Sequence, residues 1–205
     1  SSERIKTNDN IGKVERTALK NRGSTDIDLR SEKIILENIR LNFPDHSILS
    51  EEAGLIKGDS QDYTWVIDPL DGTINYCHGM EPFCLGICLV KDKKPILSIV
   101  YHPAKDKLYL AEKGKRTFLN GRKVSVSSNS ELKNSVLMTH LSSSKKESRM
   151  KTLDTIERTF EQILQVRIYG SGLSTMSYVA SGKFDMFLDI KTNLKLAIEN
   201  EKSLL

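Results

Sequence analysis

The pattern of apolar and polar positions divides the chain into a helical start, a series of short strands and an alternating end. Apolar residues recur at helical spacing over residues 24–43, so we predict a helix there, and Pro44 ends it. Short apolar runs then predict strands, and the last four of them, separated by polar turns, predict an antiparallel meander. These runs are Ser47–Ser50, Tyr63–Ile67, Phe83–Val90, Ile96–His102, Lys107–Glu112 and Arg116–Leu119. The polar residues 57–62 are predicted to form a loop.

The last third of the chain alternates between short strands and helices. The predicted strands are Val136–Thr139, Val166–Tyr169 and Phe184–Leu188, and the predicted helices are Leu153–Leu164 and Ser174–Ser181. This order favours an α/β (α+β) protein in which layers of helices and a mixed sheet pack together. We expect an N-terminal part, residues 1–135, that carries the candidate site, and a smaller C-terminal α/β part, residues 136–205.

Composition and charge exclude several classes of function. Hydrophobic residues make up 38% of the chain and charged residues 28%, as in ordinary globular proteins. The net charge of +4 is too small to indicate a nucleic-acid partner. No apolar run approaches the ~18 residues of a membrane helix, so we expect no membrane partner. Cys77, Cys84 and Cys88 fit neither a zinc site nor a disulfide scaffold, and we expect them to be reduced core residues of a cytoplasmic protein.

Two acidic residues at the end of an apolar strand are the most informative feature. Asp68 and Asp71 follow Tyr63–Ile67, and Pro69 between them predicts a sharp turn of the backbone. Such a turn would let both carboxylates and the carbonyl of Leu70 converge on one point. Converging carboxylates repel each other unless they share a proton or a cation neutralises them. Oxygen ligands at this density favour Mg²⁺ or Mn²⁺.

The residues that follow this acidic pair suit an anion. Gly72 allows a backbone amide to approach a ligand closely, and Thr73 adds a hydroxyl group. Amides beside a cation site form a matching site for phosphate. The segment therefore indicates metal-assisted chemistry on a phosphate ester. The alternative is an acidic turn that caps a helix starting near Gly72, because Asp, Pro and Gly are the usual turn residues.

Several motifs, in the same order along the chain, resemble the signature of the inositol monophosphatase family. The matching segments are Thr25–Asp28 followed by Glu32, Phe43–Gly54, Asp68–Asn75, Lys113–Gly121, Gly170–Gly172 and Tyr178–Asp185. The resemblance covers roughly residues 24–190 and is more specific than any single motif. It implies a layered α-β-α-β sugar-phosphatase fold with a large, mostly antiparallel sheet. It also implies a Mg²⁺-dependent, lithium-sensitive enzyme that hydrolyses a small phosphate monoester through a metal-activated water.

The same resemblance implies which residues bind metal. Glu52, Asp68 and the carbonyl of Leu70 would hold a first ion, and Asp68 and Asp71 would bridge to a second. Mn²⁺ is a possible substitute for Mg²⁺, and Li⁺ is the expected inhibitor. Glu51 is interpreted as a solvated neighbour or a supporting group.

The resemblance also assigns the phosphate and the attacking water. Gly72 and Thr73 would offer amides to the phosphate. Thr73, oriented by Asp28 and assisted by Glu52, would help to activate the water. The alternative for Asp28 is a first-turn acid that stabilises its helix through the macrodipole.

The substrate class follows from the archaeal branch of the family, which acts on inositol monophosphate and fructose 1,6-bisphosphate. The residues around Gly170 and Ser171, and the segment that contains Asp189 and Lys191, resemble that branch. Arg167 and Lys191 would hold a second phosphate or sugar hydroxyls, and Asp189 would accept hydrogen bonds from hydroxyls. The alternative is ordinary surface charge at the ends of strands.

One departure from the family lies near the C-terminus. No Asp stands at residues 196–198, where the family places another metal ligand. Our hypothesis is that an internal segment is missing between about Lys195 and Ala197. Otherwise the second metal would be weakened, and the protein would be a catalytically impaired metal-binding homologue. The other alternative is a nucleotide phosphatase acting on 3′-phosphoadenosine phosphate or NADP. From the family we also expect a homodimer.

Overall fold

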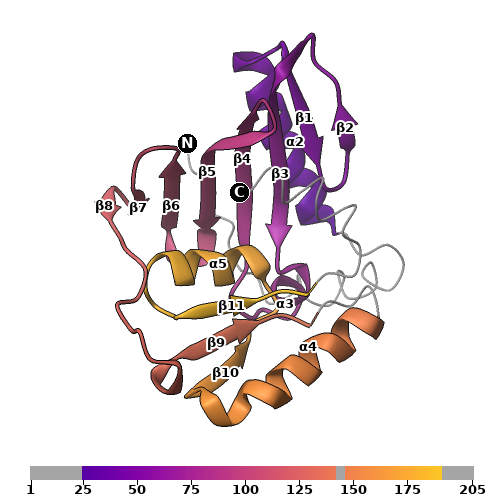
Figure 1. Ribbon diagram of the computed structural model, residues 1–205. Coiled ribbons are helices and arrows are strands. Elements are labelled where there is room, and N and C mark those ends of the chain that lie inside the picture. The colour runs from indigo at the N-terminus through magenta and orange to yellow at the C-terminus, as the bar shows by residue number, and fades with distance from the viewer. Residues whose placement is uncertain (1–24, 142–145, 191–205) are drawn as a thin grey trace.

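A large sheet forms the frame of the molecule (Figure 1). The structure is a computed structural model and describes residues 25–141 and 146–190. The eight strands lie in the order β2-β1-β3-β4-β5-β6-β7-β8. Their bounds are β1 His46–Ser50, β2 Gly54–Ile56, β3 Ser60–Asp71, β4 Cys84–Lys91, β5 Lys94–His102, β6 Lys107–Glu112, β7 Thr117–Leu119 and β8 Arg122–Lys123. Only β1 and β3 pair in parallel, so the prediction of a large, mostly antiparallel sheet is confirmed.

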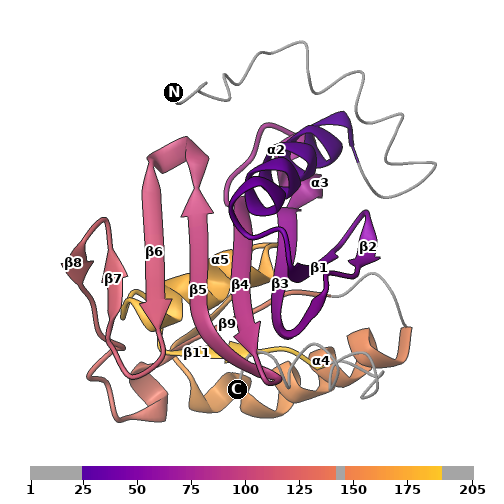
Figure 2. The same ribbon diagram turned by 90° about the horizontal axis from the view of Figure 1, so that it is seen from above.

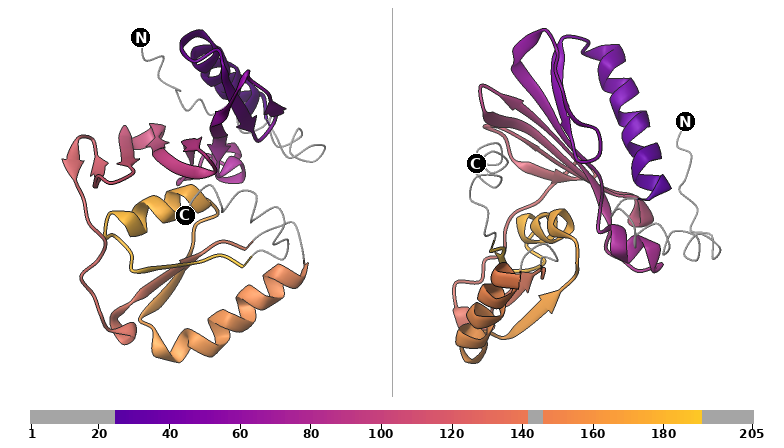
Figure 3. Two further views of the ribbon diagram at one scale, coloured as in Figure 1. Left: turned by 45° about the horizontal axis from the view of Figure 1, so that its top comes forward. Right: turned by 90° about the vertical axis from the view of Figure 1, so that its right-hand side faces the viewer.

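A second, smaller sheet lies beside the first. Its strands run in parallel in the order β10-β9-β11. They are β9 Val136–Thr139, β10 Gln165–Ile168 and β11 Met186–Leu188. Helices α4 (Lys146–Thr159) and α5 (Gly172–Ala180) lie on opposite sides of this sheet (Figure 3). The boundary expected at residue 135 stays a prediction, although the small sheet begins at Val136.

The helices and sheets form alternating layers. Helix α2 (Asp26–Asn42) covers one face of the large sheet, and α5 lies on the other face, as Figure 2 also shows. Helix α5 contacts β3, β4 and β5 of the large sheet and β9 and β11 of the small one. A Cβ atom at Gly86 would stand 2.3 Å from Leu173 Cδ1, so this glycine lets α5 approach β4. The expected α-β-α-β layering is confirmed.

Two apolar clusters hold these layers together. Ile39 of α2 packs against Ile48, Trp65 and Ile67 of the large sheet. Between the two sheets, Tyr109, Met138 and Tyr178 form a second buried cluster. The helical spacing that predicted α2 is therefore the spacing of its sheet-facing side chains.

The predicted elements are found, with differences at their ends. The helix over 24–43 and the meander are confirmed, whereas helix α4 begins seven residues earlier than predicted, at Lys146. The remaining short elements are helix α3 (Thr73–Cys77) and the 3₁₀ turns Pro103–Lys105, Leu132–Asn134 and Phe160–Gln162. Among the described residues, no helix is both long and apolar enough to cross a membrane.

Strand β3 departs most from the prediction. It begins at Ser60, inside the predicted loop, and continues through Pro69 to Asp71. Asp68 pairs with Gly86 and Asp71 with Cys84, so the two residues between them bulge opposite a single partner. Proline is tolerated in sheets at bulges, because the ladder hydrogen bond that it cannot donate is already absent there. The predicted sharp turn is therefore a bulge within a continuing strand.

Candidate active site

The bulge in β3 brings Asp68 and Asp71 together. In a regular strand, residues three positions apart point to opposite faces of the sheet. The irregular register between Asp68 and Asp71 removes this alternation. The Asp71 carboxylate then acts electrostatically on Asp68 and raises its pKa. The bulge therefore brings the two carboxyl groups close enough to interact, and their convergence on one point with the carbonyl of Leu70 stays a prediction.

The third carboxyl group at this point is that of Glu51. Strand β1 runs parallel to β3 with Ser50 beside Ile67, so Glu51 follows β1 where Asp68 follows Ile67. Its backbone N–H donates to the carbonyl of Ile67 at 3.1 Å, and its side chain is hydrogen-bonded to Asp68. Glu51 is exposed to solvent and also hydrogen-bonded to Asp68, so it is a solvated neighbour that supports this acid, as one of the interpretations from the sequence has it.

Crowding of acids and burial perturb both groups. Burial is the largest cause that raises the pKa of Asp68, to about 9, followed by the charges of Asp71 and Glu51. Burial also raises the pKa of Glu51, and the charges of Glu52, Asp28 and Asp71 add to this effect. Near neutral pH the pair Glu51–Asp68 therefore holds a proton that an isolated carboxyl group would have lost.

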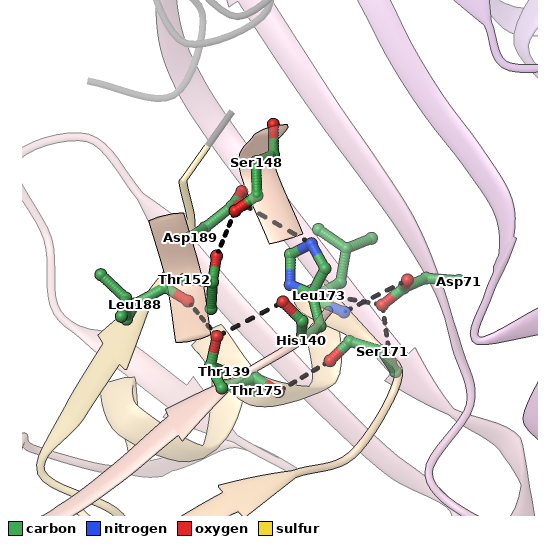
Figure 4. A network of polar contacts seen from close by, with 11 residues as sticks. Asp71, Thr139, His140, Ser148, Thr152, Ser171, Leu173, Thr175, Leu188 and Asp189 are labelled. Atoms are coloured by element: carbon green, nitrogen blue, oxygen red, sulfur yellow. Dashed lines mark hydrogen bonds and ion pairs between the residues drawn. The ribbon is translucent and has the colours of Figure 1, made fainter. Parts of the chain in front are cut away.

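Asp71 is fixed by the N-terminus of α5. Its carboxylate accepts hydrogen bonds from Ser171 Oγ at 2.5 Å, from the Leu173 amide at 2.7 Å and from the Gly172 amide at 3.3 Å. Figure 4 shows Ser171 and Leu173 facing Asp71. The start of a helix favours a carboxylate, because its amides are unpaired and its dipole is positive there. The contact joins the end of β3 to the smaller part of the molecule.

Gly72 is required at its position by the backbone. It has a φ of +88°, and a Cβ atom there would stand 2.9 Å from the carbonyl oxygen of Pro82. Gly72 precedes α3 as its cap, so a helix does start there, but no Asp side chain caps it as the alternative reading required. The site and the helix start occupy the same segment.

Thr73 and Asp28 are brought together from distant parts of the chain. Thr73 Oγ1 lies 3.3 Å from Asp28 Oδ1 and 2.9 Å from the carbonyl oxygen of Leu70. Asp28 is buried, and its other oxygen accepts from the Thr25 amide at 2.8 Å and from the Thr25 hydroxyl. Asp28 therefore stabilises the start of α2, as the structural interpretation has it, and it also contacts Thr73. Its role in orienting the attacking water stays a prediction.

The oxygen atoms of Glu51, Asp68 and Asp71 suit a hard cation, but in this structure the three side chains do not surround a single point. Across residues 25–141 and 146–190, no three Asp, Glu, His or Cys side chains stand together as a metal-binding group. Glu51 and Asp68 bond to each other, while Asp71 bonds to the start of α5. All three groups offer oxygen, which Mg²⁺ and Mn²⁺ prefer. Of the predicted ligand Glu52, the structure shows that its backbone amide donates to Glu32 at 3.2 Å.

The predicted substrate residues occupy different surroundings. Ser171 is buried and its hydroxyl also lies 2.6 Å from Ser174 Oγ, so it supports Asp71. Gly170 is exposed with a φ of +70°, and exposed Arg167 bonds its neighbour's carbonyl at 2.9 Å. Asp189 Oδ1 lies 3.6 Å from His140 Nε2 (Figure 4). Their contacts with a substrate stay predictions.

Other predictions fall beyond the described part of the chain. Lys191 and the segment near Lys195 and Ala197, where we expect an omission, lie outside the described residues. The structure therefore leaves both as predictions.

Sequence reasoning placed Glu32 and Asn75 in the matching motifs but assigned neither of them a supporting role. Glu32 is buried and accepts hydrogen bonds from the turn that carries Glu51. Asn75 donates to the carbonyls of Pro82 at 2.7 Å and Tyr169 at 2.6 Å, and so ties α3 to the end of β10. The signal for Glu32 was its position one helical turn after Asp28, on the same face of the helix. No comparable signal marks Asn75.

Comparison with known proteins adds an independent line of support. Residues 3–197 match the family model described as the inositol monophosphatase family. A fructose-1,6-bisphosphatase/inositol-1-monophosphatase from Aquifex aeolicus is 34% identical, covering 89% of this chain and 70% of that protein. The Nus factor SuhB of Escherichia coli K12 is 31% identical, covering 81% of this chain and 62% of that protein.

Solved structures show the same similarity. The inositol monophosphatase from Anabaena superposes with a TM-score of 0.76 at 34% identity, covering 87% of this chain and 69% of that one. The SuhB protein of Bartonella henselae gives a TM-score of 0.77 at 29% identity, covering 80% and 64%. The chain spans between 60% and 70% of the length of the curated relatives it matches.

Proposed function

We propose a function from one premise: the chain belongs to the inositol monophosphatase family. The protein is a phosphatase that hydrolyses a small phosphate monoester with a divalent cation, for which we propose Mg²⁺. The proposed substrates are inositol 1-phosphate and fructose 1,6-bisphosphate. Support for this pair comes from the Aquifex aeolicus relative, whose name carries both activities.

The observation that carries the proposal is the crowding of Glu51, Asp68 and Asp71 at one corner of the large sheet. Burial and like charge raise the pKa of Asp68 to about 9, which marks a site that is incomplete without positive charge. A divalent cation bound there would neutralise these groups, hold the substrate phosphate and lower the pKa of a water molecule. Glu51, Asp68, Asp71 and the carbonyl of Leu70 are the groups that we propose to hold it.

Thr73 and Asp28 are the proposed groups for orienting the attacking water. A hydroxyl group has one proton to donate and two lone pairs with which to accept. When Thr73 donates to Asp28, 3.3 Å away, its lone pairs remain available to accept a hydrogen bond from water. Thr25 holds the buried Asp28 in place, and Thr73 can donate its one proton to Asp28 when the competing acceptor, the carbonyl of Leu70 at 2.9 Å, faces the cation instead. The amides of Gly72 and Thr73 are proposed to bind phosphate oxygens.

The remainder of the substrate would lie toward the smaller sheet. Asp189 and Gly170 approach from that side, and Arg167 and Lys191 are proposed to hold a second phosphate or hydroxyl groups. Positioning of this kind accounts for much of the rate enhancement in phosphoryl transfer.

Two alternatives remain as outcomes of the test. A nucleotide phosphatase would act on 3′-phosphoadenosine phosphate or NADP at the same cation site. A protein that binds without turnover is the second alternative, and the Escherichia coli relative that is named a Nus factor is the reason to include it.

A substrate panel tests the proposal directly. Phosphate release is measured from all four substrates with and without Mg²⁺, and again with lithium. We expect release from inositol 1-phosphate and fructose 1,6-bisphosphate only with Mg²⁺, inhibited by lithium and lost in Asp68→Asn. Asp62→Asn, an exposed acid on the same strand, is the matched control and should keep full activity. Release from the nucleotides alone would favour the first alternative, and no release at all would contradict an enzymatic function.

Assembly and compartment are carried as proposals with their own tests. We propose a homodimer, which sedimentation at several protein concentrations would verify. We also propose a cytoplasmic location, because Cys77, Cys84 and Cys88 are buried and form no disulfide within the described part of the chain, as a reducing compartment allows.

A further inference from the structure

Glu32 occupies an unusual place for a carboxylate. It lies in the second turn of α2, only 5% exposed, and faces the large sheet rather than solvent. Its Oε1 atom accepts hydrogen bonds from the Ala53 amide at 3.0 Å, from the Glu52 amide at 3.2 Å and from the Ser50 hydroxyl. The three donors lie at the last residue of β1 and in the turn that follows it. One buried oxygen therefore accepts hydrogen bonds from most of the segment 50–53.

These three donors flank Glu51 on both sides. Ser50 precedes it, and Glu52 and Ala53 follow it. The amide of Glu51 itself is held from the opposite direction by the carbonyl of Ile67. The backbone on each side of Glu51 is therefore fixed by α2 and by β3. A turn without these bonds would leave the direction of the Glu51 side chain undetermined.

Attachment of α2 to the sheet does not require Glu32. Ile39, Ile35 and Leu36 of the same helix pack against Ile48 and Trp65 of the sheet. An apolar side chain at position 32 would add to that packing without burying a charge. The buried carboxylate is therefore explained by what it binds, which is the turn.

We propose that Glu32 is a positioning residue, which fixes the turn of residues 50–53 so that Glu51 meets Asp68 and completes the cation site. This inference rests on the proposed function, because it assigns Glu51 to the cation. Glu32 acts through Glu51 and itself touches neither cation nor substrate. Residues that orient metal ligands in this way typically change metal affinity by about 10- to 100-fold when they are removed.

The test uses the full chain and Mn²⁺ as the probe. Mn²⁺ affinity is measured from the paramagnetic resonance signal of the free ion, and hydrogen exchange is measured at the amides of Glu52 and Ala53. We expect Glu32→Ala to weaken Mn²⁺ binding about 10-fold or more and to speed exchange at both amides. Glu32→Gln keeps an oxygen acceptor in place and should stay within about threefold of wild type.

Two further variants separate positioning from stability. Ile39→Ala removes buried packing from the same helix and should lower the melting temperature without changing Mn²⁺ affinity. Ser50→Ala removes one of the three donors and should weaken binding by about threefold, which keeps the test decisive if Glu32→Ala does not fold.

The possible results separate this inference from the proposed function. Unchanged Mn²⁺ affinity in Glu32→Ala and Ser50→Ala, with wild type binding Mn²⁺ and releasing phosphate, would overturn the inference alone. Weakening of equal size in Ile39→Ala would also overturn it, because the effect would then be one of stability. A wild-type chain that binds no Mn²⁺ would overturn the proposed function and this inference together.

Discussion

Glu32 and Asp68 are two carboxyl groups that reach the same turn, residues 50–53, and their surroundings are opposite. Glu32 is surrounded by donors, one hydroxyl and two backbone amides. Asp68 is surrounded by acids: Glu51 is hydrogen-bonded to it and Asp71 acts on it through its charge. Within residues 25–141 and 146–190, the donor that Asp68 does have is the Leu70 amide, at 3.2 Å. Beside the same turn, the carboxylate of Glu32 has hydrogen-bond donors that compensate its charge, whereas the carboxyl group of Asp68 has acids as its main neighbours.

This difference separates a structural acid from a functional one. A buried carboxylate with matching donors stabilises the fold, because its charge is compensated where it stands. A buried carboxyl group among other acids destabilises the fold unless it keeps a proton or gains a cation. Strongly raised pKa values of this kind gather at functional sites. The contrast therefore points to the end of β3 as the site of chemistry and to Glu32 as its support.

The largest expected effect is on catalysis, in Asp71→Asn. We expect turnover to fall by about 10³-fold, which corresponds to ~4 kcal/mol in the activation free energy, because the charge that faces the cation is lost. The fold should survive, because the remaining amide oxygen can still accept from Ser171 Oγ and the Leu173 amide, and only the 3.3 Å bond from the Gly172 amide is lost. Steady-state phosphate release and circular dichroism measure the two parts. Near-wild-type turnover would remove Asp71 from the site.

The second test is stability. Replacing Glu32 should lower the free energy of unfolding, and replacing Asp68 should raise it. Glu32→Ala leaves three donors without their acceptor and should lower the free energy of unfolding by about 2–4 kcal/mol. Asp68→Asn should raise the stability of the metal-free protein at pH 8 by about 1 kcal/mol, because it removes like-charge crowding. Urea unfolding without metal measures both. A lower free energy of unfolding in Asp68→Asn would contradict the claim that Asp68 destabilises the metal-free protein.

The pH dependence of this second effect has a defined direction. The pKa of Asp68 is about 9 in the folded protein and near 3.8 as its ordinary value. The folded state therefore binds more protons than the unfolded state between about pH 4 and 9, and wild-type stability falls as pH rises through that window. The advantage of Asp68→Asn should grow with pH over the same range.

A third and smaller effect couples cation binding to protons. Because Asp68 keeps its proton up to about pH 9, a cation must displace that proton in order to bind. Mg²⁺ affinity should therefore rise with pH, by up to about tenfold per unit below pH 9. Calorimetry in two buffers of different ionisation enthalpy measures the proton released. An affinity independent of pH from 6 to 9 would show that Asp68 does not bind the ion.

The smallest effect lies far from the acidic corner. His102 is buried, stacks on Tyr178 and lies 3.0 Å from Ser177 Oγ. Burial, reinforced by the charge of Lys183, lowers its pKa to about 4. The unfolded state therefore binds more protons between about pH 6.5 and 4, and stability should fall by roughly 1–2 kcal/mol as pH decreases through that window.

Two variants isolate this contribution. His102→Gln should abolish the loss, because glutamine does not titrate and still bonds Ser177. His78→Gln changes an exposed histidine and should show the same loss of stability at acid pH as wild type. An unchanged slope in His102→Gln would show that other groups cause the loss.

Local patterns predicted the large sheet well and the site only in part. Alternation and polar turns gave β4 to β7, because each strand pairs with the next along the chain. The small sheet pairs β9 with strands that begin far along the chain, and periodicity does not encode such pairing. The layered order was expected from the resemblance rather than from periodicity.

The acidic residues of the candidate site also depend on contacts between distant parts of the chain, which local patterns do not encode. Asp68 and Asp71 were found because proline and glycine mark their segment. The contact of Glu51 with Asp68 arises in a turn beyond the last paired residues of β1 and β3, and no local pattern encodes the direction of a side chain in such a turn. The role of Glu32 depends on a turn that lies 18 to 21 residues away in the sequence. Sequence patterns alone therefore led to the segment of Asp68 and Asp71, the contact of Glu51 with Asp68 came from the structure, and Glu52 as a metal ligand stays a prediction.

The most direct measurement is a crystal structure of the protein with Mn²⁺, using the anomalous scattering of the ion to locate it. The account predicts an anomalous peak among the carboxyl oxygens of Glu51, Asp68 and Asp71, with the Glu51–Asp68 hydrogen bond replaced by bonds to the ion. A peak bound elsewhere, or none at saturating Mn²⁺ with Glu51 still bonded to Asp68, would contradict it.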